Sequence, residues 1–192
     1  MVDLLFEFME IPNVLPIIGF KIQYTVKRYI LVIGIIAFVI AVDQMTKIWA
    51  VENLMNQPST SYLGGFFRFT FARNEGAFLS LGSGLSGGWK TWALTILPVV
   101  VLLYILFQTL FSKSMGQWQI IAFSFILGGG LSNIYDRIVH GSVVDFMVLE
   151  AFGWHTGIFN IADNAIMLGL FMMIPTLFSS NKKKEKPLDE EA

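Results

Sequence analysis

The sequence predicts an all-α membrane protein with a small β element, in which four transmembrane helices form a bundle. Three observations lead to this fold class. Of the 192 residues, 55% are hydrophobic and only 14% are charged, whereas about 25% are charged in a typical soluble domain. The mean hydropathy is +0.64. Four windows are long and apolar enough to cross a bilayer core, which takes about 20 helical residues.

The four predicted spans follow one another along the chain. Proline lies inside two of them, at Pro98 and Pro175, and membrane helices tolerate proline because neighbouring groups satisfy the freed backbone. We therefore expect kinks at these positions and not helix ends. The predicted spans are residues 29–50, 91–111, 117–138 and 159–180.

The distribution of lysine and arginine predicts that both termini are cytoplasmic. Eight of the 13 basic residues lie on one side of the predicted spans, and cytoplasmic loops carry an excess of such residues. The first 20 residues contain no basic residue, which is not typical of a signal peptide. The predicted parts are a cytoplasmic leader (1–28), a four-span membrane domain (29–180) and a charged cytoplasmic tail (181–192). The eight basic residues are Lys21, Lys27, Arg28, Lys113, Lys182, Lys183, Lys184 and Lys186.

The two loops on the outer side differ in their patterns. Phe67, Phe69 and Phe71 alternate with other residues, which predicts a strand with one aromatic face. Residues 79–88 are rich in glycine and serine, and residues 142–149 form a second strand-like run. We expect a small sheet on the outer membrane surface, with its aromatic side chains toward lipid or substrate.

The composition excludes several kinds of chemistry. The chain has no cysteine, which excludes disulfides, thiolate metal sites and cysteine nucleophiles. With two histidines, a histidine-rich metal site is not expected. A net charge of −1 does not favour a nucleic-acid partner, which would need a basic face. We therefore expect no metal, no cofactor and no nucleic acid, and chemistry that uses Asp, Glu, Ser, Thr, Lys or Tyr.

Ionisable residues at the outer ends of the spans are the candidate functional residues. A charge at membrane depth costs several kcal/mol unless it is paired or hydrated. Asp43 and Lys47 are spaced i, i+4 and can pair on one helix face. Asp163 lies in the first turn of the last span, and Asp145 lies in the loop before it. The same outer ends also carry Asn133, Asp136, Arg137 and Asn160.

Each acidic residue also has a purely structural interpretation. Asp43 and Lys47 would be an ion pair that fixes the end of the first span, and Asp136 would belong to an interfacial network. Asp163 would be stabilised by the helix macrodipole, and Asp145 would be a surface aspartate. Considered together, Asp145 and Asp163 favour a functional interpretation, because both are predicted on the same membrane side near one short loop.

Two carboxylates in a partly dry site can share one proton, because both cannot ionise cheaply. The ionised member can then activate water while the protonated member polarises a carbonyl group. We hypothesise that Asp145 and Asp163 form such a hydrolytic pair, with Asp163 the better candidate for the ionised member. A serine nucleophile, a small transporter and a non-catalytic scaffold are the alternatives.

The polar motifs together resemble those of lipoprotein signal peptidase, also called signal peptidase II, an aspartyl protease family (family A8). The resemblance covers about residues 25–180, and the motifs occur in the family's order. Ser132 stands where the family pattern has glycine, and Asn164 stands where it has serine. The motifs are residues 43–47 (DQMTK), 74–78 (NEGAF), 129–137 (GGLSNIYDR), 143–146 (VVDF) and 159–163 (FNIAD).

The resemblance implies a membrane-embedded endopeptidase of the bacterial inner membrane. It would remove the signal peptide from lipid-modified prolipoproteins, cleaving before the diacylglyceryl-cysteine. The implied fold is a four-helix bundle with a β-cradle on the outer, periplasmic face, where the active site would lie. The expected partners are prolipoprotein substrates and membrane lipid, and the expected state is a monomer.

The resemblance also implies the roles of individual residues. The strand 66–71 and the loop 79–88 would hold the substrate, and the glycines of the loop would permit movement. Asp136 is counted with the supporting residues because it lies in the same helical motif as Asn133. The implied catalytic residues are Asp145 and Asp163, and the implied supporting residues are Asp43, Lys47, Asn74, Gly76, Asn133, Arg137, Asn160 and Ala162.

Overall fold

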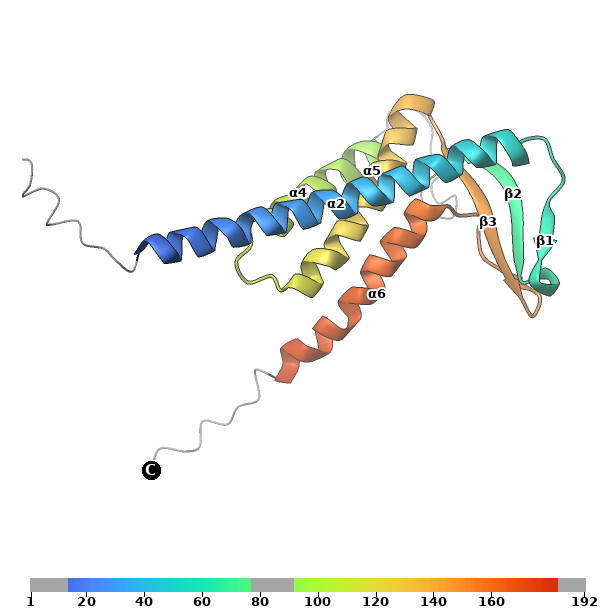
Figure 1. Ribbon diagram of the computed structural model, residues 1–192. Helices are drawn as coiled ribbons and strands as arrows, with labels where there is room; N and C mark the ends of the chain where they lie inside the picture. The colour runs from blue at the N-terminus through green and yellow to red at the C-terminus, as the bar shows by residue number, and fades with distance from the viewer. Residues whose placement is uncertain (1–13, 77–91, 183–192) are drawn as a thin grey trace, which may run out of the picture.

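The computed structural model describes residues 14–76 and 92–182, and it is mostly helical with a small antiparallel sheet at one end (Figure 1). The predicted loop 79–88 and the first 13 residues lie outside the described residues. The long helices are α2 (Val14–Leu54), α4 (Leu97–Phe111), α5 (Gln117–His140) and α6 (Ile161–Lys182). The strands are β1 (Thr60–Tyr62), β2 (Phe67–Asn74), β3 (Val143–Ala151) and β4 (Trp154–His155). Two short helical turns are η1 (Leu63–Gly65) and η3 (Trp92–Ile96).

Each of the four predicted spans corresponds to a helix. The first predicted span is part of α2, which begins 15 residues before it, at Val14. Within the described ranges, two helical segments are long and apolar enough to cross a membrane, Val26–Leu54 and Trp92–Phe111. A shorter apolar segment covers Ile161–Thr176 in α6. The mostly helical fold with a small sheet is therefore confirmed.

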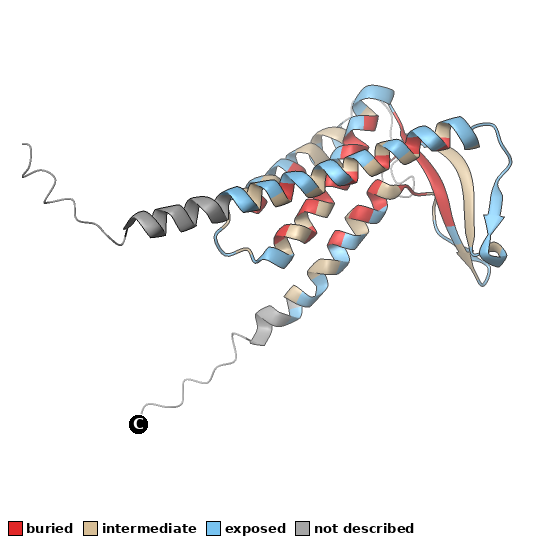
Figure 2. Cartoon of the chain, viewed as in Figure 1, coloured by how far each residue is buried: buried red, intermediate tan, exposed pale blue. Residues whose placement is uncertain are grey.

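The helix α5 is central, because it packs against α2, α4 and α6. Three consecutive glycines allow this close approach, as small residues do in membrane helices. A Cβ atom at Gly128 would meet α2, and a Cβ atom at Gly130 would meet α4. At Gly129 it would collide with the carbonyl group of Ala162, at the start of α6. Figure 2 shows the result, with buried residues along α5, at the start of α6 and along β3.

A π-helical turn precedes Pro98, one of the two prolines inside the predicted spans. The π-helical turn η3 runs directly into α4, and Pro98 lies in the first turn of α4. Proline has no N–H group to donate into the preceding turn, so the regular hydrogen-bond pattern cannot continue through it. Pro175 lies inside α6, which continues to Lys182. The irregularity expected at Pro98 is thus a π-helical turn.

The sheet has the strand order β1-β2-β3-β4, and all neighbouring strands are antiparallel. The two predicted strand segments therefore pair with each other as β2 and β3, with a register shift between Phe69 and Ala72. Half-buried Phe67, Phe69 and Phe71 pack against the end of α2 and against β3. The aromatic face was expected toward lipid or substrate, but part of it contacts the chain's own helix.

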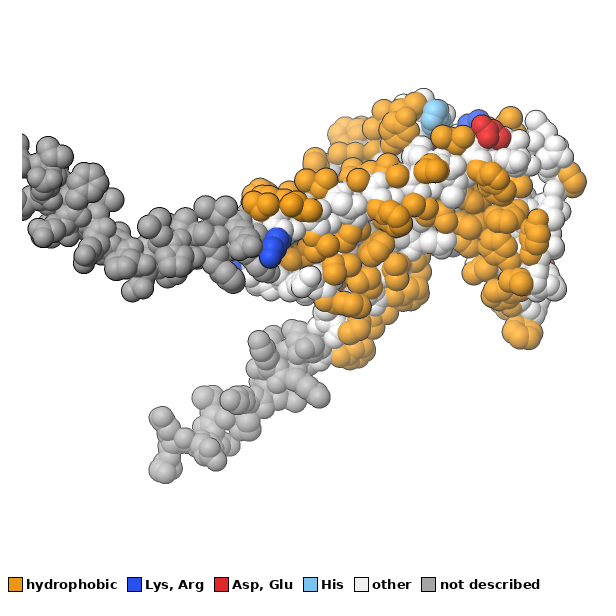
Figure 3. Space-filling model, in the orientation of Figure 1, with side chains coloured by type: hydrophobic (Ala, Val, Ile, Leu, Met, Phe, Trp, Pro, Cys, Tyr) orange, Lys and Arg blue, Asp and Glu red, His pale blue; other side chains and the backbone are white. Residues whose placement is uncertain are grey.

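The two ends of the helical bundle carry different charges. Arg28 of α2 donates hydrogen bonds to the carbonyl oxygens of Thr109 and Ser112, both at 2.7 Å. These bonds place the N-terminal part of α2 beside the C-terminal end of α4. Figure 3 shows mainly hydrophobic side chains along the outer surface of the helices, with basic groups at one end and mixed charges near the sheet. The surface between the ends is thus apolar on the visible face.

Candidate active site

The N-terminus of α6 fixes the position of Asp163. The backbone N–H of Asp163 donates to Asn160 Oδ1 over 2.9 Å, and the backbone N–H of Asn160 donates to Asp163 Oδ2 over 3.2 Å. This reciprocal arrangement is a capping box, in which two side chains satisfy two free N–H groups at a helix start. The carboxylate of Asp163 is therefore held in one orientation, and it is buried.

Asp145 lies in β3, where amide groups from two other segments hold its carboxylate. Asn74, at the end of β2, donates to Asp145 Oδ2 over 2.7 Å. Asn160 donates from the same Nδ2 atom to Asp145 Oδ1 over 2.7 Å and to the backbone carbonyl of Val144 over 3.4 Å. Asn160 thus contacts both Asp145 and Asp163, which brings the two predicted catalytic carboxylates to one site.

Asn133 of α5 completes the set of amides. Its Nδ2 atom donates to Asp163 Oδ1 over 2.9 Å. Its Oδ1 atom accepts a hydrogen bond from Lys47 Nζ over 2.9 Å and one from Asn160 Nδ2 over 3.3 Å. Because two donors contact its oxygen, the Asn133 amide has a defined orientation, with its nitrogen toward Asp163.

The environment of Asp145 favours its protonated form. The pKa of Asp145 is raised from 3.8 to about 6, mainly by burial and also by the nearby charge of Asp163. Hydrogen bonds from Asn74 and Asn160 and the charge of Lys47 oppose this rise in the pKa. The result is a carboxyl group that can hold or release a proton near neutral pH.

A second acidic cluster lies beside this pair. Lys47 Nζ is 2.6 Å from Asp43 Oδ2 and 2.6 Å from Asp136 Oδ2, and all three side chains are buried. The predicted i, i+4 pair of Asp43 and Lys47 is therefore present. Asp43 Oδ1 also accepts a hydrogen bond from the backbone N–H of Ala162 over 2.8 Å. This bond ties the cluster to the first turn of α6, one residue before Asp163.

Two further residues of the second cluster were missed by sequence reasoning. Ser132 donates to Asp43 Oδ2 over 2.7 Å, and Gln44 donates to Ser132 Oγ over 3.0 Å and to Asp136 Oδ1 over 2.9 Å. Both residues lie inside motifs that were noticed, and Ser132 was noticed as a departure from the family pattern. Two buried carboxylates beside one ammonium group need additional donors, and that imbalance is the signal that could have identified them.

Arg137 and Gly76 support the other side of the site. Arg137 Nη2 donates to the carbonyl oxygen of Gly76 over 2.7 Å, and Nη1 donates to the carbonyl oxygen of Asn133 over 3.2 Å. The N–H group of Gly76 donates to Asn74 Oδ1 over 2.8 Å. The amide of Asn74 is thereby oriented with its nitrogen toward Asp145. Arg137 links the end of β2 to α5.

The two aspartates line a pocket with a volume of about 270 Å³. Polar residues form one part of the pocket wall, and apolar residues of η3, α4, α5 and α6 form the rest of the wall. The polar lining residues are Asn74, Asn133, Arg137, Asp145 and Asp163. The apolar ones include Leu94, Pro98, Ile134, Ile166, Met167 and Leu170. Such a pocket suits an apolar ligand that carries a group to be hydrolysed.

The structure thus brings the predicted site residues into one connected network. Asp145 and Asp163 line the pocket, while Asp43, Lys47 and Asp136 form the second cluster. Ala162, at the start of α6, joins this cluster through its backbone N–H. Ser80 and the loop 79–88 lie outside the described residues. Among the described residues, no group of three or more histidine, cysteine or acidic side chains could hold a metal ion.

Comparison with known proteins gives consistent results. A family described as signal peptidase (SPase) II matches residues 35–179. A lipoprotein signal peptidase of Alteromonas mediterranea is 38% identical over 154 residues, which covers 80% of this chain and 82% of that protein. Another, of Cellvibrio japonicus, is 38% identical over 154 residues and covers 79% of this chain and 89% of that protein. The matched range includes both aspartates of the pocket.

Solved structures give the same picture for the fold. A structure described as a bacterial membrane enzyme, obtained by the in meso method, has a TM-score of 0.67 and 29% sequence identity. The similarity covers 82% of this chain and 94% of that chain. A second structure with the same description also has a TM-score of 0.67 and 29% identity, and covers 76% of this chain and 91% of that chain.

Proposed function

The chain belongs to the signal peptidase II family, membrane-bound aspartic proteases of bacteria that remove the signal peptide from prolipoproteins, and we propose that Asp145 and Asp163 perform the hydrolysis. The observation that supports this assignment most is the shared contact with Asn160, which donates to Asp145 and forms a capping box with Asp163. Both carboxylates also line the same pocket. The scissile peptide bond precedes the lipid-modified cysteine.

Asp163 is the base and Asp145 the acid in the proposed mechanism. Asp163 accepts a proton from water, the water oxygen attacks the scissile carbonyl carbon, and Asp145 donates its proton to the carbonyl oxygen. The tetrahedral diol then collapses as its C–N bond breaks. The leaving nitrogen takes the proton from Asp163, and Asp145 regains a proton from a diol hydroxyl group. The products are the signal peptide with a new carboxyl terminus and the lipoprotein with a free amino terminus.

The environments of the two aspartates support these different roles. Burial and the charge of Asp163 raise the pKa of Asp145 to about 6, so this carboxyl group keeps its proton up to a higher pH than an ordinary aspartate. Asp163 accepts hydrogen bonds from a backbone N–H and from the Asn133 amide at the positive end of the α6 dipole, and these donors stabilise its charged form against the cost of burial. Pairs of titratable groups in unequal environments are typical of acid–base catalysis.

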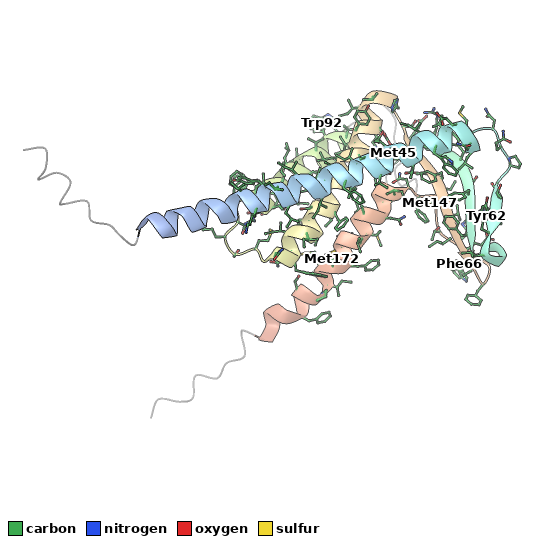
Figure 4. All side chains as sticks on the ribbon, viewed as in Figure 1. Met45, Tyr62, Phe66, Trp92, Met147 and Met172 are labelled. Carbon is green, nitrogen blue, oxygen red and sulfur yellow. The ribbon has the colours of Figure 1, made fainter. Side chains whose placement is uncertain are left out.

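The shape of the pocket supports a substrate that arrives from the bilayer. Its apolar residues come from η3, α4, α5 and α6, and Trp92 and Leu97 at this end are exposed. Figure 4 shows Trp92 at the end of the helical bundle that is nearer the sheet. A signal-peptide helix lying among these helices would place its cleavage site beside the carboxylates. Asn74 and Arg137 would position the peptide backbone.

The arrangement of the helices supports four spans with both termini in the cytoplasm. Arg28, in the first half of α2, lies beside the end of α4, as its hydrogen bonds require. Figure 1 shows the end of α6 at this same end of the bundle, opposite the sheet. In the sequence, basic residues cluster in the first half of α2 and directly after α6, which is typical of segments on the cytoplasmic side. The sheet and the pocket would then face the periplasm.

The small sheet would rest on the outer surface of the membrane as a cradle for the substrate and its lipid. Phe69 lies 5.4 Å from the ring of Trp49, so the aromatic face of β2 is turned toward the helices. We propose that the enzyme acts as a monomer. The partners in this proposal are prolipoproteins and membrane lipid, with no cofactor.

Substitution of each aspartate tests the proposal. The full chain, reconstituted in lipid, is assayed with a lipid-modified prolipoprotein, and the cleaved signal peptide is measured. We expect Asp145→Asn and Asp163→Asn each to lower kcat on the order of 10²- to 10⁴-fold, the usual contribution of an acid or base. Asp136→Asn is the matched control, because Asp136 contacts Lys47 and lies outside the pocket lining. Cleavage at the wild-type rate in either dyad variant would contradict the proposal.

A further inference from the structure

The far edge of the sheet consists of two adjacent turns, and together with Trp154 we call them the sheet tip. One turn is η1, which includes Leu63, and the other joins β3 to β4 at Phe152 and Gly153. The N–H group of Glu150 donates to the carbonyl oxygen of Phe66 over 2.8 Å, and this hydrogen bond holds the turns together. In Figure 1 these turns lie at the lower right, at the end of the sheet that is remote from the helical bundle.

Large apolar side chains at the sheet tip are exposed. Phe152 is fully exposed, Trp154 is 83% exposed and Leu63 is 79% exposed. Leaving a side chain of this size in water forgoes about 1.5–3 kcal/mol that burial would provide. Tyr62 and Phe66, labelled in Figure 4, are about half exposed at the same edge. The sheet tip is therefore an apolar surface that lacks cover from the described part of the chain.

The backbone at these turns adds a second cost. Among the described residues other than glycine, Asn56, Leu63 and Phe152 have a positive φ, at 63°, 53° and 53°. Asparagine adopts this left-handed conformation readily, whereas for leucine and phenylalanine it costs about 1–2 kcal/mol of conformational free energy. At Leu63 and Phe152 a large apolar side chain is thus strained as well as exposed. Asn56 is the residue that folding alone would favour at such a position.

The outer half of the sheet separates apolar from charged residues by face. Strand pairing places Tyr62, Phe67 and Leu149 on one face, and Ala151 and Trp154 pair on that same face because residues 149 and 151 alternate with 150. The opposite face carries the polar residues Ser61, Arg68, Glu150 and His155, including the Arg68–Glu150 ion pair at 3.2 Å, together with buried Val148. A sheet with this pattern fits a boundary between an apolar and an aqueous phase.

The apolar face is turned toward the helices. Ring contacts join Trp49 of α2 to Phe69, and Phe69 in turn to Tyr62 and Phe67, at centroid distances of 4.8–5.8 Å. Figure 3 shows hydrophobic side chains on the helix-facing side of the sheet, in line with the apolar surface of the bundle. The same lipid layer that surrounds the helices would therefore lie beneath this face.

We propose that the sheet tip is a membrane anchor, in which Leu63, Phe152 and Trp154 insert into the outer leaflet of the bilayer. The proposal rests on the membrane arrangement of the proposed function, and it adds which residues enter the lipid. Burial in lipid would offset the cost of exposing all three side chains in water, and the cost of backbone strain at Leu63 and Phe152. Tryptophan is also favoured at the lipid–water boundary. Insertion would also fix the distance of the sheet from the bilayer, and therefore the position of Asp145 in β3 relative to the membrane surface.

The experiment measures the depth of the sheet tip with a spin label. The chain has no cysteine, so Trp154→Cys and Ser61→Cys each give one labelling site, on the apolar and polar faces respectively. In vesicles of phosphatidylethanolamine and phosphatidylglycerol, the label at 154 should relax with dissolved oxygen and the label at 61 with a water-soluble nickel chelate. Equal accessibility at the two sites would overturn the proposal.

Substitution of the turn residues separates anchoring from folding. Leu63→Asn with Phe152→Asn removes the apolar groups and relieves the strained backbone. We expect the label at 154 to become several-fold more accessible to the nickel chelate, while Tm in detergent stays equal or rises. Leu63→Met with Phe152→Leu is the matched control, which keeps both the apolar groups and the strain and should keep the label in lipid. An unchanged label position in the asparagine variant, or a lowered Tm, would contradict the anchor.

A catalytic variant distinguishes this proposal from the function on which it rests. Asp145→Asn should abolish cleavage and leave the accessibility of the label at 154 unchanged. If Asp145→Asn retained activity while the label stayed in lipid, the dyad would be wrong and the anchor correct. If cleavage required Asp145 while the label at 154 was exposed to water, the anchor would be wrong and the dyad correct.

Discussion

The chain buries two pairs of aspartates near the C-terminal end of α5, and it holds them by different means. Asp43 and Asp136 each lie 2.6 Å from the ammonium group of Lys47. Asp145 and Asp163 are held by side-chain amides and a backbone N–H group. An ammonium group compensates the charge of a carboxylate, whereas an amide orients a carboxylate without adding charge. The comparison shows how one small site can contain an ion-paired acidic cluster beside the pair that we propose to carry the proton.

The largest effect is expected from removing the cation of the structural cluster. Lys47→Met would leave Asp43 and Asp136 buried without their counter-ion, and breaking such a group by removing one partner costs about 3–5 kcal/mol. Thermal unfolding in detergent should show a lower Tm. Adding Asp43→Asn and Asp136→Asn to Lys47→Met should recover part of the loss. A loss of less than about 1 kcal/mol, the value of an exposed pair, would mean that the cluster is not structural.

A smaller effect is expected from the pH dependence of stability. Because the pKa of Asp145 is raised from 3.8 to about 6 in the folded chain, its contribution to stability is full below 3.8 and is lost as the pH rises through about 6. Asparagine does not titrate. The stability of Asp145→Asn relative to the wild type should therefore rise between pH 4 and pH 8, by on the order of 3 kcal/mol. Parallel pH profiles of Tm for the two proteins would contradict this.

Asn160 connects the two carboxylates, and its substitution should affect catalysis more than folding. Asn160→Ala removes a hydrogen bond to Asp145 and the side chain that caps α6 beside Asp163. We expect kcat to fall about 10- to 100-fold, because a displacement of a catalytic group by about 1 Å can cost on the order of 10²-fold in rate. The cap itself contributes about 1 kcal/mol to stability. A wild-type kcat with a lowered Tm would limit Asn160 to the helix cap.

The smallest effect concerns Ser132, which stands where the family pattern has glycine. Ser132→Ala removes the hydroxyl that donates to Asp43. We expect the free energy of unfolding to fall by about 1–2 kcal/mol, while cleavage is largely retained. Ser124→Ala is a matched control, because buried Ser124 of the same helix donates only to the Ile120 carbonyl oxygen in its own helix among the described contacts. Equal losses in the two variants would show that Ser132 has no special role in the cluster.

Local patterns in the sequence predicted much of this fold and site. The apolar windows give the helices, the alternating phenylalanines give β2, and the i, i+4 spacing gives the pair of Asp43 and Lys47. Contacts between distant segments could not be predicted in this way. Ser132 and Asp43 are 89 residues apart, and Asn74 reaches Asp145 only because β2 pairs with β3 after a register shift. The glycines of α5 are local, but which helices they admit depends on the assembled bundle.

The backbone conformation of the sheet tip also could not be predicted from local sequence patterns. The positive φ of Leu63 and Phe152 contradicts their residue types, so local preferences would have placed an asparagine or a glycine there. Such a conflict between residue and conformation is visible only once the turns are placed. At such positions an interaction with the surroundings of the protein, here the proposed contact with lipid, can override the local conformational preference.

The claim that Asp145 and Asp163 share a proton is tested most directly by titrating the Asp145 carboxyl group. Infrared spectra of the full chain in lipid, with Asp145→Asn subtracted, isolate the C=O stretch of its protonated form. We predict a midpoint near pH 6, and a lower midpoint in Asp163→Asn, because the charge of Asp163 raises the pKa of Asp145. A midpoint near 3.8, or one that Asp163→Asn leaves unchanged, would contradict the shared proton.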